Sequence, residues 1–154
     1  MDLVSKYNIQ APRYTSYPTV PYWDNNLDEP KWIEHIKQAF IKYNKDGISL
    51  YIHLPYCESL CTYCACNTRI TVNHKVETPY IESLLKEWQL YLYQFEGKPL
   101  IKEIHLGGGT PTFFSPENLA YLLTSILSTV DIAPNHDFSF EGHPSNTTKA
   151  HLRA

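Results

Sequence analysis

Apolar residues recur at helical spacing in three segments of the chain, and three shorter runs between them have the composition of β-strands. The pairs Thr78-Pro79 and Ser115-Pro116 are predicted to supply the N-cap and the first helical residue of the second and third helices. Residues 1–27 show neither period and are expected to form an irregular arm. The predicted helices are 29–44, the segment from Thr78 to Gly97, and the segment from Ser115 to Leu127; the predicted strands are 48–54, 101–106 and 137–141.

Strands and helices alternate in the order βαβαβ, which predicts an α/β fold. Such units pack as parallel strands joined by right-handed crossovers. Three of these strands form either a small open sheet or part of a larger barrel, and in a barrel their apolar runs would be covered on both faces. The segments that leave the C-terminal ends of parallel strands carry the chemistry of such folds. Here those segments are the cysteine loop, GGGTPT (107–112) and EGHP (141–144), which are predicted to share one rim.

Composition narrows the classes of function. A length of 154 residues suits one domain, and a hydrophobic content of 43% excludes wholesale disorder. The net charge is -3 without a basic stripe, so nucleic acid is a poor candidate partner. No apolar signal segment or run of transmembrane length is present, which predicts a cytoplasmic protein without a membrane partner. The final KAHLRA resembles an interrupted helix, so we expect the chain to be a fragment.

All four cysteines, Cys57, Cys61, Cys64 and Cys66, lie in one short loop. A disulfide framework would spread its cysteines, so the clustering indicates a metal or redox centre in a reducing compartment. Three closely spaced thiolates can hold an iron–sulfur cubane and leave one iron open for a ligand. Cys66 follows Cys64 too closely to reach that iron easily. Structural zinc and an oxidised or free group of thiols are the alternatives, although zinc sites usually combine two separated pairs of ligands.

The spacing Cys-x3-Cys-x2-Cys resembles the signature of the radical SAM superfamily, whose cofactor is S-adenosylmethionine (SAM). The resemblance implies that Cys57, Cys61 and Cys64 bind a [4Fe-4S] cluster, and that the amino and carboxylate groups of SAM bind its open iron. It also implies that one electron from the cluster cleaves SAM to a 5′-deoxyadenosyl radical, which abstracts hydrogen from the substrate.

Three further matches indicate which family within this superfamily the chain resembles. Cys66 extends the pattern to Cys-x3-Cys-x2-Cys-x-Cys, which resembles the anaerobic coproporphyrinogen III oxidases; related heme chaperones and heme-degrading paralogs commonly lack that cysteine. RYTSYPT (13–19) is similar to the N-terminal arm of these oxidases. YIHLPYC (51–57) is similar to their lead-in to the cluster, and the resemblance extends from residue 13 to residue 144.

The family implies a fold and a domain division. The chain resembles the N-terminal part of a parallel (βα) radical SAM partial barrel, preceded by an irregular N-terminal arm. Residues 1–47 would form the arm and a helix, and residues 48–154 the first part of a truncated core domain.

The resemblance also carries over cofactor-binding residues from the two other rim segments. Gly108, Gly109 and Thr110 would contact SAM, because backbone without side chains can approach closely and its carbonyls can accept hydrogen bonds from an ammonium group. A simple tight turn is the alternative. Glu141 would contact the SAM cation, with a solvated strand-end carboxylate as the alternative. His143 stands where the family more commonly has Asp, and its role stays open.

Two tyrosines and three histidines complete the candidate set. The resemblance makes Tyr51 and Tyr63 neighbours of SAM; core packing and loop exposure, respectively, are their alternatives. His53, His74 and His105 are expected to be structural, although His53 or His74 could also contribute to a zinc site.

The family implies oxidative decarboxylation of two propionates of coproporphyrinogen III to vinyl groups, giving protoporphyrinogen IX in anaerobic heme biosynthesis. It also implies a monomer served by an electron donor such as flavodoxin or ferredoxin. No acid–base catalytic residue is nominated, because the cofactor carries the chemistry. A heme-degrading radical SAM methyltransferase and a heme chaperone without oxidase activity are the alternatives. Without its later strands the chain alone would leave its third strand unpaired, and we expect it to be inactive.

Overall fold

The computed structural model describes residues 2–8, 22–23, 26 and 28–154. The chain divides into two compact units, Met1–Trp32 and Ile33–Ala154. In the first unit the described residues include helix α1 (Leu3–Tyr7), in which no residue is buried. The RYTSYPT motif at 13–19 lies outside the described residues, as does most of the expected arm. All candidate site residues lie in the second unit.

The elements after α1 follow the βαβαβ order that the pattern predicts. Between Glu29 and Phe140 the 3-10 turns are η2 (Asn44–Asp46), η3 (His74–Val76) and η4 (Pro111–Phe113). The helices and strands are α2 (Glu29–Tyr43), β1 (Ile48–Leu54), β2 (Tyr56–Cys57), β3 (Arg69–Ile70), α3 (Glu77–Leu92), β4 (Leu100–Gly108), α4 (Pro116–Leu127) and β5 (Asp131–Phe140).

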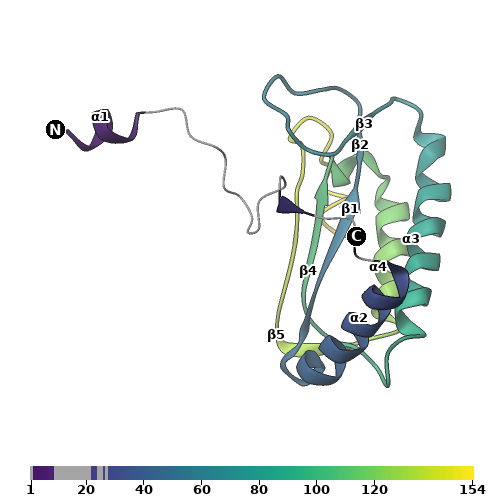
Figure 1. The fold of residues 1–154 in the computed structure, drawn as a ribbon. Coiled ribbons are helices and arrows are strands. Elements are labelled where there is room, and N and C mark those ends of the chain that lie inside the picture. The colour runs from purple at the N-terminus through teal and green to yellow at the C-terminus, as the bar shows by residue number, and fades with distance from the viewer. Residues whose placement is uncertain (1, 9–21, 24–25, 27) are drawn as a thin grey trace. The chain divides into compact units, whose positions relative to one another are not determined.

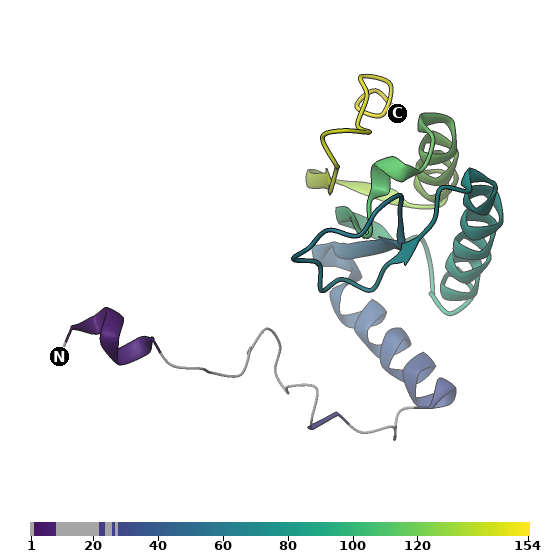
Figure 2. The same ribbon diagram turned by 90° about the horizontal axis from the view of Figure 1, so that it is seen from above.

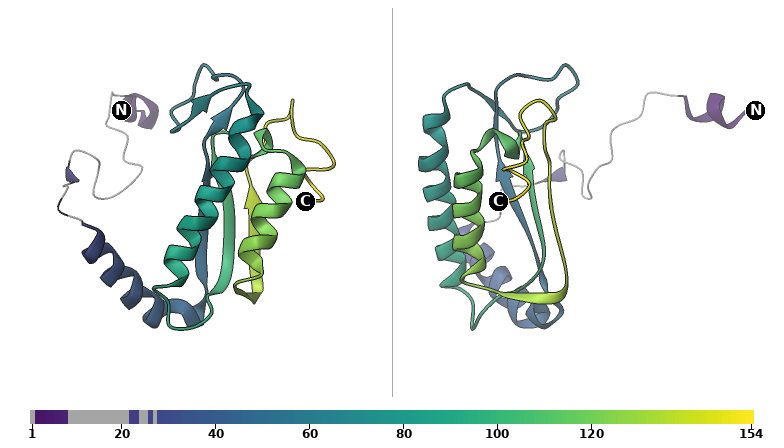
Figure 3. Two further views of the ribbon diagram at one scale, coloured as in Figure 1. Left: turned by 90° about the vertical axis from the view of Figure 1, so that its right-hand side faces the viewer. Right: turned by 180° about the vertical axis from the view of Figure 1, so that it is seen from behind.

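The main sheet has the strand order β1-β4-β5, and both pairs of neighbours are parallel. The predicted parallel arrangement is therefore confirmed. Helices α3 and α4 lie side by side on one face of this sheet (Figures 1 and 3). Seen from above, the cysteine loop and the segment after β5 lie at the same end of the sheet (Figure 2). The predicted common rim is thus present.

The two faces of the sheet differ in chemistry. Leu50, Ile104 and Phe138 are paired in register on the helix-covered face, and the next such row is Ile52, Leu106 and Phe140. The opposite face carries polar rows, Ser49–Glu103–Asp137 and Tyr51–His105–Ser139. The expectation of continuous apolar runs in the three strands is therefore wrong. The strands alternate in polarity, and only one face contributes to the core.

The core is built between that apolar face and the two helices. It includes the completely enclosed side chains of Leu54, Ile81 and Leu122, from β1, α3 and α4 respectively. The C-terminal half of α2 joins it through Phe40, whose ring stacks on Phe95 at a centroid distance of 4.3 Å. None of the helices in the described part of the chain is long and apolar enough to cross a bilayer.

Several boundaries differ from the sequence prediction. Strand β5 begins at Asp131 instead of residue 137, and its pairing with β4 shifts register between Ile132 and Asp137. Pro134 lies in that shift, since a residue without an N–H cannot continue a ladder. The pattern therefore detected only the second half of the strand.

The two predicted helix caps have different outcomes. Ser115 is the N-cap of α4, and its hydroxyl accepts a hydrogen bond from the N–H of Asn118, as predicted. Thr78 is not the N-cap of α3, because the η3 turn leads directly into a helix that begins at Glu77. At the C-terminus, residues 149–153 form turns and not the expected start of a helix.

We predict that Ile104→Ala lowers the free energy of unfolding by about 2–5 kcal/mol, because it leaves a cavity in the core. Ile104 is 2% exposed on the central strand. Leu90→Ala is the control: Leu90 is 65% exposed on α3, so its loss should change stability by less than about 0.5 kcal/mol. Urea titration followed by circular dichroism measures both variants, and equal losses would contradict the assignment of the core face.

Candidate functional site

The cysteine loop leaves β1 at Pro55 and is closed at its base by a small second sheet. In this sheet β2 pairs in parallel with β3, bringing Cys57 opposite Ile70. The N–H of Arg69 donates to the carbonyl of Pro55 at 2.8 Å, and the N–H of Thr71 donates to the carbonyl of Cys57 at 2.9 Å. The two-residue strands are too short to have a period, which is why the pattern did not predict them. Their pairing fixes both ends of the loop.

The glycine-rich segment passes directly against the end of β1. The N–H groups of Gly109 and Thr110 donate to the carbonyls of Leu54 and Tyr56 at 2.9 and 3.0 Å. A Cβ on Gly109 would lie 2.5 Å from the carbonyl oxygen of Pro55. Gly108 has a φ of +116°, and a Cβ there would meet the ring of His53 at 2.6 Å. Gly109 is therefore required for close packing of backbone on backbone, and Gly108 for its backbone conformation and for the space that the His53 ring occupies.

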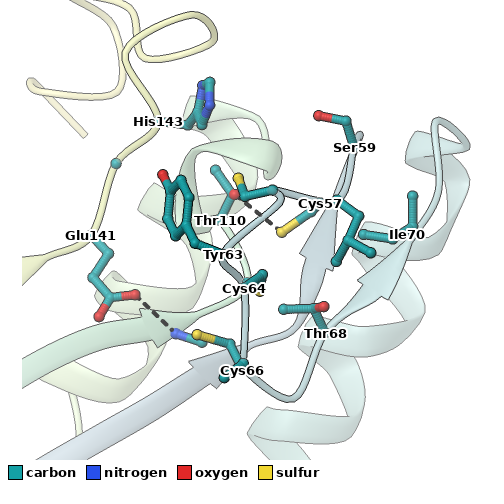
Figure 4. Close-up of a pocket in the computed structure, with 16 residues that line it drawn as sticks. Cys57, Ser59, Tyr63, Cys64, Cys66, Thr68, Ile70, Thr110, Glu141 and His143 are labelled. Atoms are coloured by element: carbon teal, nitrogen blue, oxygen red, sulfur yellow. Dashed lines mark hydrogen bonds between the residues drawn. The ribbon is translucent and has the colours of Figure 1, made fainter.

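Side-chain hydrogen bonds connect the three rim segments. The Cys57 thiol lies 3.2 Å from the Thr110 hydroxyl, and the N–H of Gly108 donates to a carboxylate oxygen of Glu141 at 3.2 Å; dashed lines mark both in Figure 4. Thr112, which is buried, connects the glycine-rich segment to the chain after β5. Its hydroxyl donates to the Asn146 side chain at 2.8 Å and accepts from the N–H of His143 at 3.3 Å. The rim is consequently one connected structure.

Together the three segments enclose a cavity of about 280 Å³ (Figure 4). This volume is close to the lower end of the range for ligand pockets, roughly 300–1,000 Å³. Ten candidate residues from the sequence line it: Cys57, Cys61, Tyr63, Cys64, Cys66, Gly108, Gly109, Thr110, Glu141 and His143. Among the residues predicted to bind the cluster or SAM, Tyr51 alone is outside the lining.

The cysteines are free thiols at the wall of this cavity. Within the described residues, no three His, Cys, Asp or Glu side chains converge as the ligands of a single metal ion would. An iron–sulfur cluster has a different requirement, because each thiolate binds its own iron and the sulfurs surround the cluster. The donor set of three thiols spread around one cavity therefore fits a cluster better than a single zinc ion.

Cys66 differs from the other three cysteines. Its side chain is exposed, and the charge of the Cys64 thiolate, followed by a hydrogen bond with Cys64, raises the pKa of the Cys66 thiol. Cys66 therefore keeps its proton to a higher pH than an isolated thiol would. The other three cysteines, which are the predicted cluster ligands, are only partly exposed.

The two candidate tyrosines occupy different environments. Tyr63 is 88% exposed in the cysteine loop and lines the cavity. Tyr51 lies on the polar face of the sheet, where its ring stacks on His105 and its hydroxyl is 3.1 Å from Nδ1 of His53. Burial raises the pKa of Tyr51, and the charges of Glu141 and Cys66 add to this effect. Tyr51 is thus a neighbour of the cavity and not part of its wall.

Two of the three histidines that are expected to be structural, His53 and His105, contact residues of the rim segments. Nε2 of His53 lies 2.8 Å from the carbonyl of Asn67, so this nitrogen carries the proton and donates to the end of the cysteine loop. His105 is 2.9 Å from the Ser139 hydroxyl and 3.6 Å from a carboxylate oxygen of Glu141. Both therefore position the rim, as expected for structural histidines.

The remaining histidine, His74, lies beside a carboxylate that sequence reasoning missed. Glu77 is 3% exposed, and it accepts hydrogen bonds from His74, from the Ser115 N–H and from the Asn118 side chain. A glutamate at the start of a helix is ordinarily exposed, so nothing in the pattern distinguished it. Thr112 was missed for a similar reason, since its burial depends on the segment after β5.

Several known proteins are similar in sequence to this chain over most of its length. No protein-family model matches the chain. An oxygen-independent coproporphyrinogen III oxidase of Mannheimia haemolytica is 36% identical over 143 residues, which cover 92% of this chain and 94% of that sequence. The oxidase of the same name from Helicobacter pylori J99 is 37% identical over 157 residues, covering 97% of this chain and 33% of that sequence. The one from Pseudomonas aeruginosa is 31% identical over 147 residues, covering 93% and 31%.

One solved structure matches closely. Coproporphyrinogen III oxidase from Escherichia coli, described as a radical SAM enzyme, superimposes with a TM-score of 0.80 at 28% sequence identity. The match covers 97% of this chain and 33% of that protein. The chain thus spans about a third of the length of several of the relatives it matches.

The chain combines a parallel sheet with a cysteine-lined cavity at the C-terminal ends of its strands, and its fold matches that of a solved enzyme of the radical SAM class. Within this class, the identity shared over nearly the whole of the Mannheimia sequence decides the family. The chain belongs to the oxygen-independent coproporphyrinogen III oxidase family.

We predict that Gly109→Ala opens the cysteine loop. The new Cβ would overlap the Pro55 carbonyl, and an overpacked site of this kind costs about 1–3 kcal/mol. Displacement of the glycine-rich segment would remove the Thr110 hydroxyl from Cys57, so Cys57 should be alkylated faster by iodoacetamide. Mass spectrometry of the labelled peptides measures the rate.

Gly97→Ala is the matched control for this variant. Gly97 has a φ of +116°, and no atom lies within 4 Å of the position that its Cβ would occupy. A left-handed alanine costs roughly 1–2 kcal/mol, so this variant loses a comparable amount of stability without a clash at the rim, whereas Gly109 has no positive φ and is disturbed by the clash alone. Faster alkylation of Cys57 in both variants would mean that general destabilisation opens the loop.

Proposed function

We propose that the protein carrying this chain is an oxygen-independent coproporphyrinogen III oxidase that oxidatively decarboxylates two propionates of coproporphyrinogen III to vinyl groups. The product would be protoporphyrinogen IX. The observation that carries the proposal is the convergence of the three rim segments, which are the cysteine loop, the glycine-rich segment and the chain after β5, on one cavity. The names of the relatives, which are 31–37% identical, support the same substrate.

In this proposal Cys57, Cys61 and Cys64 hold a [4Fe-4S] cluster. When bound, the cluster would supply the electron that cleaves SAM reductively. The chain's own contribution is to position the thiolates: β2 and β3 close the loop at Cys57, and the Thr110 hydroxyl contacts the Cys57 sulfur. Hydrogen bonds to cluster sulfurs are one of the factors that set the reduction potential, so Thr110 would also tune the cluster.

The same cavity would bind SAM through the two other rim segments. Glu141 is held by the Gly108 N–H and lies near His105, so its carboxylate is already oriented to face a cation. Gly108, Gly109 and Thr110 would offer backbone groups, with Tyr63 at the mouth of the cavity and Tyr51 beside Glu141. A site whose groups are fixed before binding loses less entropy when the ligand arrives.

The location, oligomeric state and electron donor of the protein are a separate part of the proposal. We propose a cytoplasmic monomer reduced by a flavodoxin- or ferredoxin-type donor, because a cluster of thiols needs a reducing compartment. Several of the relatives are about three times as long as this chain, and in a protein of that length further strands would enclose the polar face of the sheet. We also propose a domain division into an arm with its helix, 1–47, and the first part of the core domain, 48–154.

The cluster can be tested on its own. Anaerobic reconstitution with iron and sulfide should give about four irons and four sulfides per chain, as a cubane requires. Cys61→Ser should abolish cluster uptake, whereas Cys66→Ser should leave it intact. Metal analysis and electron paramagnetic resonance of the reduced protein measure both. One zinc per chain, or loss of the cluster in Cys66→Ser, would contradict the assigned ligand set.

The reaction requires a second experiment. A full-length protein containing this chain should convert coproporphyrinogen III to a vinyl product with SAM and a reductant in the absence of oxygen. The chain of residues 1–154 alone should give none, because its polar face is open to water. A methylated product would support a tetrapyrrole methyltransferase instead, and bound heme without turnover would support a chaperone. Vinyl product from the short chain would mean that the essential residues all lie within it.

A further inference from the structure

His74 lies between the cysteine loop and the body of the domain. Its Nδ1 is 2.7 Å from a carboxylate oxygen of Glu77, and its Nε2 is 3.6 Å from a carboxylate oxygen of Glu58. Glu58 directly follows Cys57 in the loop, whereas Glu77 is buried at the start of α3. The imidazole therefore connects the loop to a buried anchor.

The anchor is rigid because every contact of the Glu77 carboxylate comes from a fixed group. One oxygen accepts from the Ser115 N–H at 2.8 Å and from the Asn118 side chain at 2.6 Å, both at the start of α4. The other oxygen accepts from His74. A buried carboxylate with hydrogen bonds to three groups is costly to move, since any displacement would leave it unsatisfied.

The imidazole ring is held from a second direction as well. It stacks on Phe113 of η4 with a centroid distance of 4.4 Å and an interplanar angle of 14°. Since Glu77 accepts hydrogen bonds only, Nδ1 carries a proton. In the charged form of the ring, Nε2–H faces Glu58. The side chain has then little entropy left to lose when it pairs with Glu58, which removes the main cost of a half-exposed ion pair.

We propose that His74 is a positioning residue that holds the first part of the cysteine loop in place through Glu58. The small β2–β3 sheet fixes the two ends of the loop, but it leaves the span between Cys57 and Cys64 without ladder contacts. His74 constrains that span at Glu58 and at the same time contacts Phe113, next to the glycine-rich segment. The cluster thiolates are thereby oriented relative to the SAM segment before the cluster binds. The effect on the cluster rests on the proposed function, whereas the contacts of His74 with Glu58, Glu77 and Phe113 are those of the structure itself.

The variants separate this role from a purely structural one. His74→Asn keeps an amide N–H at the place of Nδ1, so it retains a donor to Glu77 and removes the contact with Glu58. Glu58→Gln removes the charge from the other side. Asn118→Ala weakens the Glu77 anchor without touching the loop, and Glu82→Gln removes an exposed carboxylate on α3. The last two are controls for stability and for net charge.

The first measurement uses the protein before reconstitution, at a mildly acidic pH. Amide hydrogen exchange in residues 58–63 should be about two- to fivefold faster in His74→Asn and in Glu58→Gln, as expected for the loss of a half-exposed ion pair. The double variant should exchange no faster than either single one. Glu82→Gln should match the parent, and Asn118→Ala should change exchange throughout α3 and α4 instead of in the loop alone.

The second measurement uses the reconstituted protein, in which His74→Asn and Glu58→Gln should both lose iron to a chelator faster than the parent and by a similar factor.

Unchanged loop exchange in His74→Asn, or additive effects in the double variant, would overturn the proposal. If the parent chain takes up no cluster but the exchange results hold, the proposed function fails and the positioning role stands. The proposed function and the positioning role of His74 are therefore contradicted by different results.

Discussion

The site depends on the close approach of the glycine-rich segment to the end of β1. Gly109 and Thr110 pair with the carbonyls of Leu54 and Tyr56 as if they continued the sheet, and no side chain fits between the two backbones. This contact fixes where Thr110 lies, and with it the hydroxyl that reaches Cys57. It also directs the Gly108 N–H toward Glu141. One steric constraint thus positions residues of all three rim segments.

Side chains on the polar face of the sheet form a second set of contacts that stabilise the rim. Tyr51 contacts His53 on its own strand and His105 on β4, and the network continues from His105 to Ser139 on β5 and from His53 to Asn67 at the end of the cysteine loop. In an isolated α/β sheet this face would be a second apolar surface. Its polarity is what an enclosed, solvated interior of a larger barrel requires, where ligands bind among hydrogen-bonding groups.

The site candidates could be found from sequence because they belong to short, contiguous motifs. Cysteine spacing, the glycine run and a strand-end glutamate are local features, and their position after parallel strands predicted that they would meet. The contribution of Glu77, Thr112 and His74 could not be found in the same way. Each is an ordinary residue whose burial or partner comes from a segment 16 to 41 positions away in the sequence, such as Glu58, Asn118 or Asn146.

The sequence by itself determined the order of strands and helices, their parallel pairing and the chemistry of the rim, because hydrophobic period, caps and motif spacing are local properties of the chain. Only the tertiary structure decided which face of the sheet is apolar, where β5 begins around Pro134, and why Gly108 and Gly109 admit no side chain. It also decided that His74 faces two carboxylates. These features depend on which distant segments touch, and contacts of that kind are settled by packing and burial of the whole domain.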